Sequence, residues 1–555
     1  MSPFQTHEVV NQVPPLEDYS LYDTDTVLRE AVQREGASGF EAVLREHGTW
    51  LGRATTLALG ERANRFPPLW KGYDACGHRM DQIEFDPAWH ALMAGIVARG
   101  LQSKAWIHPA PGAQVARAAA YLMQGQVEAG TLCPTTMTHA AVPLLQQEPA
   151  GAIDFARDWL PALASPDYDA SDTPLPGKTS ALIGMGLTEK QGGSDLRAIT
   201  TRADPVSEGK RGAVYRLTGH KWFFSVPQAD AHLVLANTED GPGCFFVPRW
   251  IPDGGRNAVR IRRLKDKLGN RSNASGEVEF EQAWGMLMGE PGRGLSLLLR
   301  MAAMTRLDCV LGSAALLRQA VVQAAHHAAH RRAFGLPLAD QPLMRNLLAD
   351  LALESEAATV LALRLARAVD ERDNPASLAL LRVGTPAAKL WVCKRAIAAI
   401  AECMEVWGGN GYVETGPLPR LYREAPVNSI WEGSGNMMAL DVSRALQRDT
   451  ACLAALHDEL DGARGAFRDY DHAWAAWQKQ MNTQLQSQSA DTGLARGWAA
   501  GLARLWQAAL LIRHAPAPVA HAFVTSRLGL PTGIAGELPV GVNVEFVLAR
   551  AWPAG

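Results

Sequence analysis

The chain has 555 residues, of which 47 % are hydrophobic and 20 % are charged, and its formal net charge at pH 7 is −3. A chain of this length is expected to form about three or four domain-sized units, and its apolar content suffices for a sizeable core. The nearly balanced charge excludes a global electrostatic preference for nucleic acid or for an anionic membrane, although it leaves room for a local basic patch.

The seven cysteines are odd in number, widely spaced and without a CxxC pair. This pattern argues against a disulfide framework and a structural zinc site, and it favours a reducing, cytoplasmic location. The opening residues, MSPFQTHEVVNQ, lack the basic and apolar segments of a signal peptide, and no run of about 20 apolar residues predicts a membrane-spanning helix.

Residues 1–180 predict an N-terminal α-helical domain. Apolar residues recur at three- and four-residue spacing in Ala88–Ile96 and in Val115–Ala129, which is the pattern of helices that bury one face. Residues 181–290 predict a middle β-barrel or small antiparallel sheet, because short alternating stretches are separated by Gly, Pro, Asn and Asp. The expected strands are Val214–Thr218, His232–Ala236, Cys244–Pro248, Val259–Ile261 and Glu277–Phe280.

Residues 291–445 predict a helical bundle, and residues 446–555 predict an additional helical C-terminal region. Long helical segments with short connections are typical of a bundle, and the four expected here are Gly294–Arg332, Leu343–Val369, Pro386–Trp407 and Ser434–Gln447. The fold class is therefore α+β and mainly α. The order of helical and strand-rich parts does not by itself determine a function.

Two motifs in the strand-rich region suit a flat, phosphate-bearing ligand. In the segment 185–195, MGLTEKQGGSD, the glycines let the backbone approach a ligand closely, and Thr188 and Ser194 offer hydroxyl groups. In the segment 220–225, HKWFFS, three aromatic residues on a short strand can present a face to a planar ring. The simpler interpretations are a turn of small residues and a half-buried aromatic strand.

Two further motifs lie where predicted helices end. In the segment 331–335, RRAFG, Arg331 or Arg332 has a fork of donors that can pair with a pyrophosphate, although an arginine at a helix C-terminus also complements the macrodipole. In the segment 405–412, EVWGGNGY, three glycines within four residues exceed the needs of a helix cap and permit a tight turn near a phosphate.

The segment 430–436, IWEGSGN, contains the candidate catalytic base. Glu432 stands in a predicted loop before a helix, where Gly433 and Gly435 expose backbone N–H groups to an anion or an oxygen-rich ligand. A carboxylate beside Trp431 is expected to be partly desolvated, which makes it a better base near neutral pH. The alternative is an acid favoured at a helix N-terminus by the dipole.

Together and in this order, the five motifs resemble the acyl-CoA dehydrogenase family, and more closely its branch named for the adaptive response to alkylation, AidB. The resemblance extends over nearly the whole chain, from Thr6–Gln12 to the C-terminal region. It is carried also by LCPTTMT at 132–138, GHKWFFSVPQADAHLVLA at 219–236, LKDKLGNRSNAS at 264–275 and NSIWEGSGN at 428–436.

The resemblance implies an N-terminal helical domain, a β-barrel and a C-terminal four-helix bundle, which hold FAD non-covalently. It also implies a homotetramer in which residues 331–341 reach the cofactor of a partner subunit. The segments at 185–194, 222–224 and 430–436 would surround the flavin ring, and 405–409 would approach the adenosine diphosphate part. The implied cofactor-binding residues are Met185, Leu187, Thr188, Gly193, Ser194, Trp222, Phe223, Phe224, Arg331, Phe334, Gln341, Glu405, Gly408, Gly409, Ile430, Trp431, Gly433, Ser434 and Asn436.

Glu432 matches the base that in this family removes the α-proton of an acyl thioester while the β-hydrogen leaves as a hydride to flavin N5. The family's other location for a base corresponds to Thr305, beside Arg306, and a threonine cannot serve. Arg444 on the next helix either reaches the same pocket or is a solvated helix residue. Arg306 and Arg444 are thus candidate substrate-pocket residues, and crowding by Trp431 and Arg444 would make turnover of a fatty acyl-CoA inefficient.

His326 and His330 have a spacing that can hold zinc on a helix, but no third ligand is evident nearby. We therefore predict a surface or subunit-contact role for them and no metal site.

The closer resemblance implies a FAD-binding protein of the DNA alkylation response that binds double-stranded DNA through its C-terminal region, with at most weak acyl-CoA dehydrogenase activity. Basic and acidic residues balance in that region, so its composition does not predict a basic face, although Arg496 and Arg504 share a helical side. The alternative is a fully active FAD-dependent acyl-CoA dehydrogenase for short or branched acyl groups. A scaffold that keeps FAD only as a structural element is the third hypothesis.

Overall fold

The computed structural model describes residues 6–149, 158–206, 210–486, 492–529 and 533–552. The chain forms two compact units, each assembled from separate stretches of sequence. The helical unit comprises Met1–Ala54, Gln114–Gln126 and Cys309–Gly555, and the barrel unit comprises Thr55–Ala113 and Val127–Asp308. None of the helices within these described ranges has the length and apolar character needed to span a lipid bilayer.

The helices of the barrel unit match the expected helical pattern. They are α3 (Ala54–Arg65), α4 (Pro87–Ala98), α5 (Lys104–Ile107), α7 (Leu132–Gln147), α9 (Leu160–Ala164) and the first turns of α10 (Gly294–His330). The start of α4 is encoded locally, because Pro87 occupies the first turn and the Asp86 carboxylate accepts the Ala88 N–H at 2.9 Å.

A β-hairpin interrupts the N-terminal helices, and the helical pattern did not predict it. Strands β1 (Leu69–Tyr73) and β2 (Arg79–Glu84) pair antiparallel. In the turn between them, the Asp74 carboxylate accepts the N–H groups of Cys76 and His78, both at 2.8 Å, which is the usual way an aspartate closes a turn. Cys76 is exposed at this tip, whereas the other six cysteines are buried, and all seven are free thiols.

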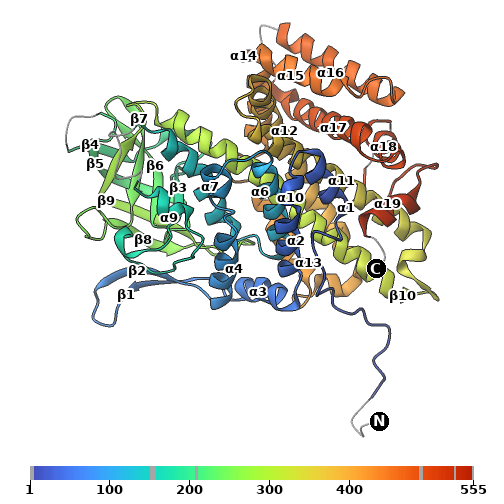
Figure 1. The fold of residues 1–555 in the computed structure, drawn as a ribbon, viewed down its shortest axis with the longest axis horizontal. Coiled ribbons are helices and arrows are strands. Elements are labelled where there is room, and N and C mark those ends of the chain that lie inside the picture. Colours follow the sequence, from blue (N-terminus) through green and yellow to red (C-terminus); the bar gives the residue numbers. More distant parts are fainter. Residues whose placement is uncertain (1–5, 150–157, 207–209, 487–491, 530–532, 553–555) are drawn as a thin grey trace. The chain divides into compact units, whose positions relative to one another are not determined.

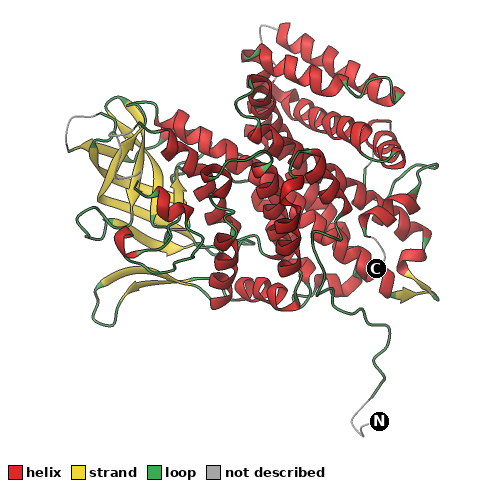
Figure 2. Cartoon of the chain, in the orientation of Figure 1, coloured by secondary structure: helices red, strands yellow, loops and turns green. Residues whose placement is uncertain are grey.

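The remaining strands form a β-barrel, which confirms the predicted middle region (Figures 1 and 2). They are β3 (Ile183–Gly186), β4 (Arg202–Pro205), β5 (Val214–Ser225), β6 (Ala231–Thr238), β7 (Gly241–Pro248), β8 (Val259–Leu264) and β9 (Ser275–Met288). The pairings β6–β4, β4–β5, β5–β9, β9–β7 and β7–β6 return to their starting strand, so the sheet closes on itself. Strand β3 joins β6 in parallel, and β8 joins β9. The interior is filled by buried side chains that include Tyr215, Phe224, Phe245 and Phe280.

The helical unit is built around long helices that the sequence pattern largely predicted. It contains α1 (Thr26–Arg34), α2 (Glu41–Leu51), α6 (Ala113–Val127), most of α10, α11 (Pro342–Asp370), α12 (Pro375–Val406), α13 (Pro417–Asn428) and α14 (Gly435–Arg448). Helix α12 begins at Pro375 rather than at the expected Pro386, because the Asn374 side chain caps the helix by accepting the Ala376 N–H at 2.9 Å. Pro386 lies inside the helix.

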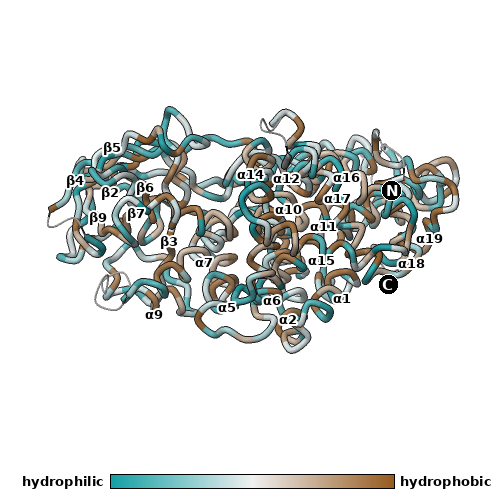
Figure 3. Tube along the Cα trace, turned by 90° about the horizontal axis from the view of Figure 1, so that it is seen from above, coloured by the Kyte–Doolittle hydropathy of each residue, from teal (hydrophilic) through white to brown (hydrophobic). Residues whose placement is uncertain are grey.

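The C-terminal residues add α15 (Thr450–Asp461), α16 (Arg468–Gln486), α17 (Ala495–His514), α18 (Ala517–Val524) and α19 (Val544–Ala551) to the helical unit. Figure 3 shows the chain coloured by hydropathy, with brown hydrophobic and teal hydrophilic residues in both the barrel unit and the helical unit. Helix α17 packs closely on α12, because a Cβ atom at Gly384 would lie 2.4 Å from the Trp506 ring. Trp506 Nε1 also donates to Glu459 Oε1 at 3.1 Å, and the same carboxylate pairs with Arg364 at 2.8 Å.

Candidate functional site

The loop that follows β3 is organised by a buried carboxylate. Glu189 is 1 % exposed. It accepts hydrogen bonds from the Thr200 N–H at 2.6 Å, the Thr201 N–H at 3.1 Å and the Lys221 ammonium at 2.7 Å. These bonds tie the segment 187–194 to strand β5 and fix the shape of the glycine-rich turn.

Glu189 and Lys221 form an ion pair with both side chains fully buried. Burial by itself raises the pKa of a carboxyl group, but the Lys221 ammonium and the hydrogen bonds from Thr201 and Thr200 hold the pKa of Glu189 well below its usual range. Burial lowers the pKa of Lys221 to about 8, against the attraction of Glu189. Both groups are therefore charged at neutral pH.

The predicted ligand residues of this loop lie on or beside β3. Met185 is a buried residue of the strand, and Leu187 and Thr188 follow it as half-buried residues. Gly193 has no room for a side chain, because its Cβ would lie 2.5 Å from Thr188 Oγ1. Within the described part of the chain, neither the Thr188 nor the Ser194 hydroxyl forms a side-chain hydrogen bond, so both groups can serve a ligand.

The aromatic strand divides into exposed and buried rings. The Trp222 N–H donates to the Thr188 carbonyl at 2.8 Å, which places Trp222 beside the loop. The Lys265 ammonium lies 3.7 Å from the centroid of the Trp222 ring. Phe223 is 53 % exposed, whereas Phe224 is 1 % exposed and packs in the barrel core against His232. Phe223 therefore presents aromatic surface for a planar ligand. The half-buried Trp222 ring is in contact with Lys265, and the buried Phe224 side chain presents no such surface.

In the helical unit, the segment 331–341 is a small hairpin of β10 (Arg332–Ala333) and β11 (Leu336–Pro337). Phe334 stands at its tip with φ +51° and is 97 % exposed. Arg331 donates to the Asn11 carbonyl, and Gln341 Nε2 donates to the Ala333 carbonyl at 3.0 Å. The base of the hairpin is thus held by hydrogen bonds, while the Phe334 ring at its tip projects into solvent.

The glycine-rich segment after α12 is open. Gly408 has φ +59°, and neither Gly408 nor Gly409 has an atom within 4 Å of a Cβ built on it. Glu405 is exposed on the last turn of the helix. The backbone at 408–409 is therefore open to an approaching group, and its role beside a phosphate stays a prediction.

Glu432 lies in the loop between α13 and α14, as predicted, and its backbone has φ +58°. A left-handed conformation is uncommon for a residue other than glycine. The next residue, Gly433, also has a positive φ of +107°, and its carbonyl accepts a hydrogen bond from the Lys389 ammonium at 2.8 Å. The chain thus makes a tight left-handed turn at the candidate base.

The residues around Glu432 are held by local bonds. Trp431 Nε1 donates to Asn428 Oδ1 at 3.1 Å, and Ile430 is 63 % exposed. Ser434 is the N-cap residue of α14. Asn436, on the first turn of α14, accepts a hydrogen bond at 2.8 Å from Arg496 of α17. The C-terminal region therefore contacts the segment that the resemblance places over the flavin ring.

The position of the alternative base is occupied by a buried threonine. Thr305 is 3 % exposed, and its hydroxyl donates to the Ala302 carbonyl of the same helix at 3.1 Å. Arg306 is half-buried in the barrel unit, and Arg444 is exposed on α14 in the helical unit. Their role in a substrate pocket stays a prediction.

The paired histidines of α10 bond to backbone carbonyls. His326 Nε2 lies 2.9 Å from the Pro14 carbonyl, and His330 Nδ1 lies 2.8 Å from the His326 carbonyl. Throughout the described residues, no group of three or more His, Cys, Asp or Glu side chains is arranged to hold a metal ion.

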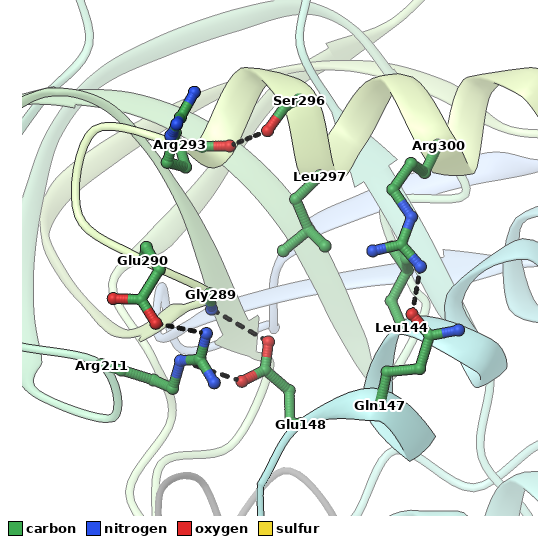
Figure 4. A pocket seen from close by; sticks show the side chains of 10 residues that line it. All are labelled: Leu144, Gln147, Glu148, Arg211, Gly289, Glu290, Arg293, Ser296, Leu297 and Arg300. Atoms are coloured by element: carbon green, nitrogen blue, oxygen red, sulfur yellow. Dashed lines mark hydrogen bonds and ion pairs between the residues drawn. The ribbon is translucent and has the colours of Figure 1, made fainter.

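A cavity of about 250 Å³ in the barrel unit lies between the C-terminus of α7 and the start of α10 (Figure 4). On one side Arg211 pairs with Glu148 at 3.5 Å and with Glu290 at 2.7 Å, and on the other Arg300 contacts Gln147. The negative charges of Glu148 and Glu290 are thus balanced by nearby guanidinium groups. We assign this cluster a structural role, joining α7 to the β9–α10 connection.

Three contacts of the site escaped prediction from sequence. They are the Glu189–Lys221 pair, the Lys265 ammonium on Trp222 and the buried Lys389 under Gly433. A usable signal existed for Lys389, which is a lone charge between apolar residues in the stretch AAKLWVC at 387–393. A charged residue on the buried face of a helix needs a partner.

Comparison with family profiles covers most of the chain. Residues 11–170 match "Adaptive response protein AidB N-terminal domain", residues 184–283 match "Acyl-CoA dehydrogenase, middle domain", and residues 292–447 match "Acyl-CoA dehydrogenase, C-terminal domain". The three matches follow one another in the order expected from the motifs.

Individual relatives agree with the profiles. The AidB protein of Escherichia coli K12 is 48 % identical over 532 residues, which cover 96 % of both chains. The structure of Caenorhabditis elegans ACDH-11 in complex with C11-CoA has a TM-score of 0.83 at 24 % identity and covers 99 % of this chain and 93 % of that one. An acyl-CoA dehydrogenase of Bacillus anthracis complexed with FAD has a TM-score of 0.64 at 17 % identity and covers 94 % of this chain and 85 % of that one. On the strength of the extended identity to AidB and the three successive profile matches, the chain belongs to the acyl-CoA dehydrogenase family, in its AidB branch.

Proposed function

We propose that this protein binds FAD and removes a proton from carbon α of an acyl-CoA thioester with Glu432 as the base. The observation that carries the proposal is the conformation of Glu432, a left-handed acidic residue in a glycine-flanked turn at the position of the family's base. Backbone strain of this kind persists where surrounding structure enforces it, and it gathers at functional sites.

The residues present suit FAD. The barrel unit offers the hydroxyls of Thr188 and Ser194, which make no side-chain hydrogen bond within the described residues, and the aromatic surface of Phe223, which is 53 % exposed. The helical unit offers open backbone at Gly408 and Gly409, where nothing lies within 4 Å of a Cβ position. Hydroxyl and backbone donors suit the polar edge of the ring and the pyrophosphate, and an aromatic surface suits its planar face.

When bound, FAD supplies the acceptor for the hydride that leaves carbon β. Glu432 takes the α-proton onto its carboxylate, and Lys389 holds the turn that carries it. An acyl-CoA is the favoured substrate class, because the C. elegans relative that shares the fold was solved with C11-CoA.

Two activity levels are compatible with this chemistry. We favour weak dehydrogenation, because Trp431 is bulky beside the base and the chain belongs with AidB, and the alternative is full activity on short or branched acyl-CoA.

The purified protein, loaded with FAD, is mixed anaerobically with butyryl-, isobutyryl- and octanoyl-CoA while the flavin absorbance is followed. Bleaching by at least one of them is expected, and Glu432→Gln should abolish it while leaving FAD bound. Persistence of bleaching in that variant would exclude Glu432 as the base.

We further infer association with double-stranded DNA and assembly as a homotetramer. Kinship with AidB supports the first, and the exposed hairpin tip at Phe334, which is 97 % exposed, supports the second. The arginines singled out in the C-terminal region have other partners in the chain. Arg496 bonds to Asn436, and the Arg504 guanidinium lies 5.4 Å from the centroid of the Trp391 ring. We therefore direct the test of phosphate contacts to other exposed cations of this region.

The seven free thiols support a reducing, cytoplasmic location for the protein.

A further inference from the structure

A buried lysine lies directly beneath the Glu432 turn. Lys389, on α12, is 1 % exposed, and its ammonium donates to the Gly433 carbonyl at 2.8 Å. Within the described residues it forms no ion pair, in contrast to the equally buried Lys221, which has Glu189 as a partner. Burial of a charge without an acid is unfavourable, so its presence at this position calls for a role other than packing.

The turn above Lys389 has the conformation that such a donor can enforce. Glu432 and Gly433 have φ values of +58° and +107° in succession. The left-handed backbone region is unfavourable for a residue with a side chain such as Glu432. The turn would therefore relax to another conformation unless other contacts fix it. The hydrogen bond from Lys389 acts on the carbonyl at the end of the turn and orients the peptide group that follows Glu432 and Gly433.

The chain on either side of the turn is anchored separately. The Ile430 and Trp431 N–H groups both donate to the Val427 carbonyl, at 2.9 and 3.0 Å. On the far side, the Met438 N–H donates to the Ser434 carbonyl at 3.0 Å and begins α14. The turn is thus a short bridge between two fixed ends, with the carboxylate on it and the lysine beneath it.

We propose that Lys389 is a positioning residue that aims the Glu432 carboxylate by holding the Gly433 carbonyl. The proposal rests on the proposed role of Glu432 as the base. Because Lys389 is 1 % exposed, it acts through the Gly433 carbonyl rather than as a reacting group. A purely structural role would be served better by methionine, which has a similar length and brings no charge into the core.

The test replaces Lys389 by Met, with Lys394→Met as the matched control. Lys394 lies close to the same segment, since a Cβ at Gly435 would meet its Cε at 2.7 Å, but it makes no hydrogen bond to the turn within the described chain. We expect Lys389→Met to bind FAD and acyl-CoA with unchanged affinity and to slow flavin reduction about 100-fold, as a misplaced catalytic group does. Lys389→Gln, which keeps an N–H donor, should recover part of the rate, and Lys394→Met should react like the unaltered protein.

Amide hydrogen exchange over residues 430–436 provides a readout that does not depend on turnover. Faster exchange in Lys389→Met than in Lys394→Met is expected, because the turn loses its fixed end. If no acyl-CoA bleaches the unaltered protein, the proposed function fails while the exchange result still decides the role of Lys389. Equal amide exchange and equal flavin reduction rates in Lys389→Met and Lys394→Met would overturn the proposal. Loss of both FAD binding and cooperative unfolding in Lys389→Met and Lys389→Gln would also overturn it, because the lysine would then be needed for the core itself.

Discussion

Glu189 shows how a single buried side chain can shape a binding loop. It receives hydrogen bonds from Gln191, Thr200 and Thr201 as well as the Lys221 ammonium, all within 3.1 Å. A carboxylate with this many donors stays ionised, and each donor belongs to a different part of the loop or of β5. The shape of the glycine-rich turn is therefore fixed by hydrogen bonds to a buried acid.

Lys221→Met should destabilise the protein by about 3–5 kcal/mol, because it leaves a buried carboxylate without its cation. Adding Glu189→Gln to that variant should restore part of the loss, since the uncompensated charge disappears. Thermal unfolding followed by calorimetry measures both effects. Equal stability of the single and double variants would show that the pair is not coupled.

The same pair predicts a dependence on pH. The pKa of Glu189 in the folded protein lies well below its usual value, so its contribution is fully present above the ordinary glutamate pKa and is lost as the pH falls toward the folded value. Acidification through the range below about pH 4.3 should therefore destabilise the unaltered protein more than the double variant.

Residue types in the motifs predict which segments carry the site, and this assignment stays a prediction. The structure adds that the Trp222 N–H donates to the Thr188 carbonyl, which links two of these segments. The sequence could not show which aromatic ring of 222–224 would be buried, because that depends on strand register in the closed barrel. It could not show the partner of Lys389 either, since Gly433 is 44 residues away along the chain.

The hairpin of β10 and β11 is hydrogen-bonded at its base and strongly exposed at its tip. Its base is bonded to residues before and after it, while Phe334 is 97 % exposed and the nearby Leu343 is 89 % exposed. Phe334 at the tip of the hairpin and Leu343 in the first turn of α11 are large exposed apolar groups, and such groups mark an interaction surface. A second copy of the chain is the occupant that we propose for it.

Phe334→Asp should reduce the mass of the particle in solution measured by light scattering, because a charge replaces an apolar contact at a subunit interface. The helical content should not change, since this side chain is almost fully in solvent. Leu69→Asp, at another exposed apolar residue at 62 %, serves as the control. A tetramer that persists in Phe334→Asp would place the interface elsewhere.

Helices and strands were predicted correctly where the hydrophobic periodicity was strong. The prediction failed where a capping residue sets the start of a helix. The five expected strands appear as β5 to β9, and the four long helices appear as α10, α11, α12 and α14. The start of α12 was wrong because Pro386 was taken as a boundary, whereas the cap at Asn374 sets it. Helix α13 and the β1–β2 hairpin were missed, since both are short and rich in Pro, Gly or charged residues.

At the scale of the whole molecule, the C-terminal region is an integral part of the helical unit. Trp506 fills the space over Gly384, and Arg527 of the last segments pairs with the buried Asp350 of α11. Removal of residues 446–555 would expose these surfaces, so loss of DNA binding in a truncated protein could not be attributed to the removal of DNA-binding side chains. Point changes at exposed cations are the informative experiment.

Full-length protein is expected to retard duplex DNA in gels, with an affinity that falls as salt rises. Arg464, Arg468 and Lys479 are exposed cations of the C-terminal region. Replacing all three by Ala should weaken binding and reduce the slope of log affinity against log salt by about 0.9 for each phosphate that is no longer neutralised. Arg202→Ala, at an exposed strand residue of the barrel, is the control. An unaltered slope in the triple variant would move DNA binding away from this region.

The tip of the β1–β2 hairpin has a practical consequence for all of these measurements. Because Cys76 is exposed and the other six thiols are buried, a maleimide dye should attach at one place in the native protein without any cysteine being removed. A fluorophore there would sit on a turn remote in sequence from Glu432, Lys389 and Phe334. Anisotropy of the labelled protein would then follow DNA addition and subunit exchange in the same sample.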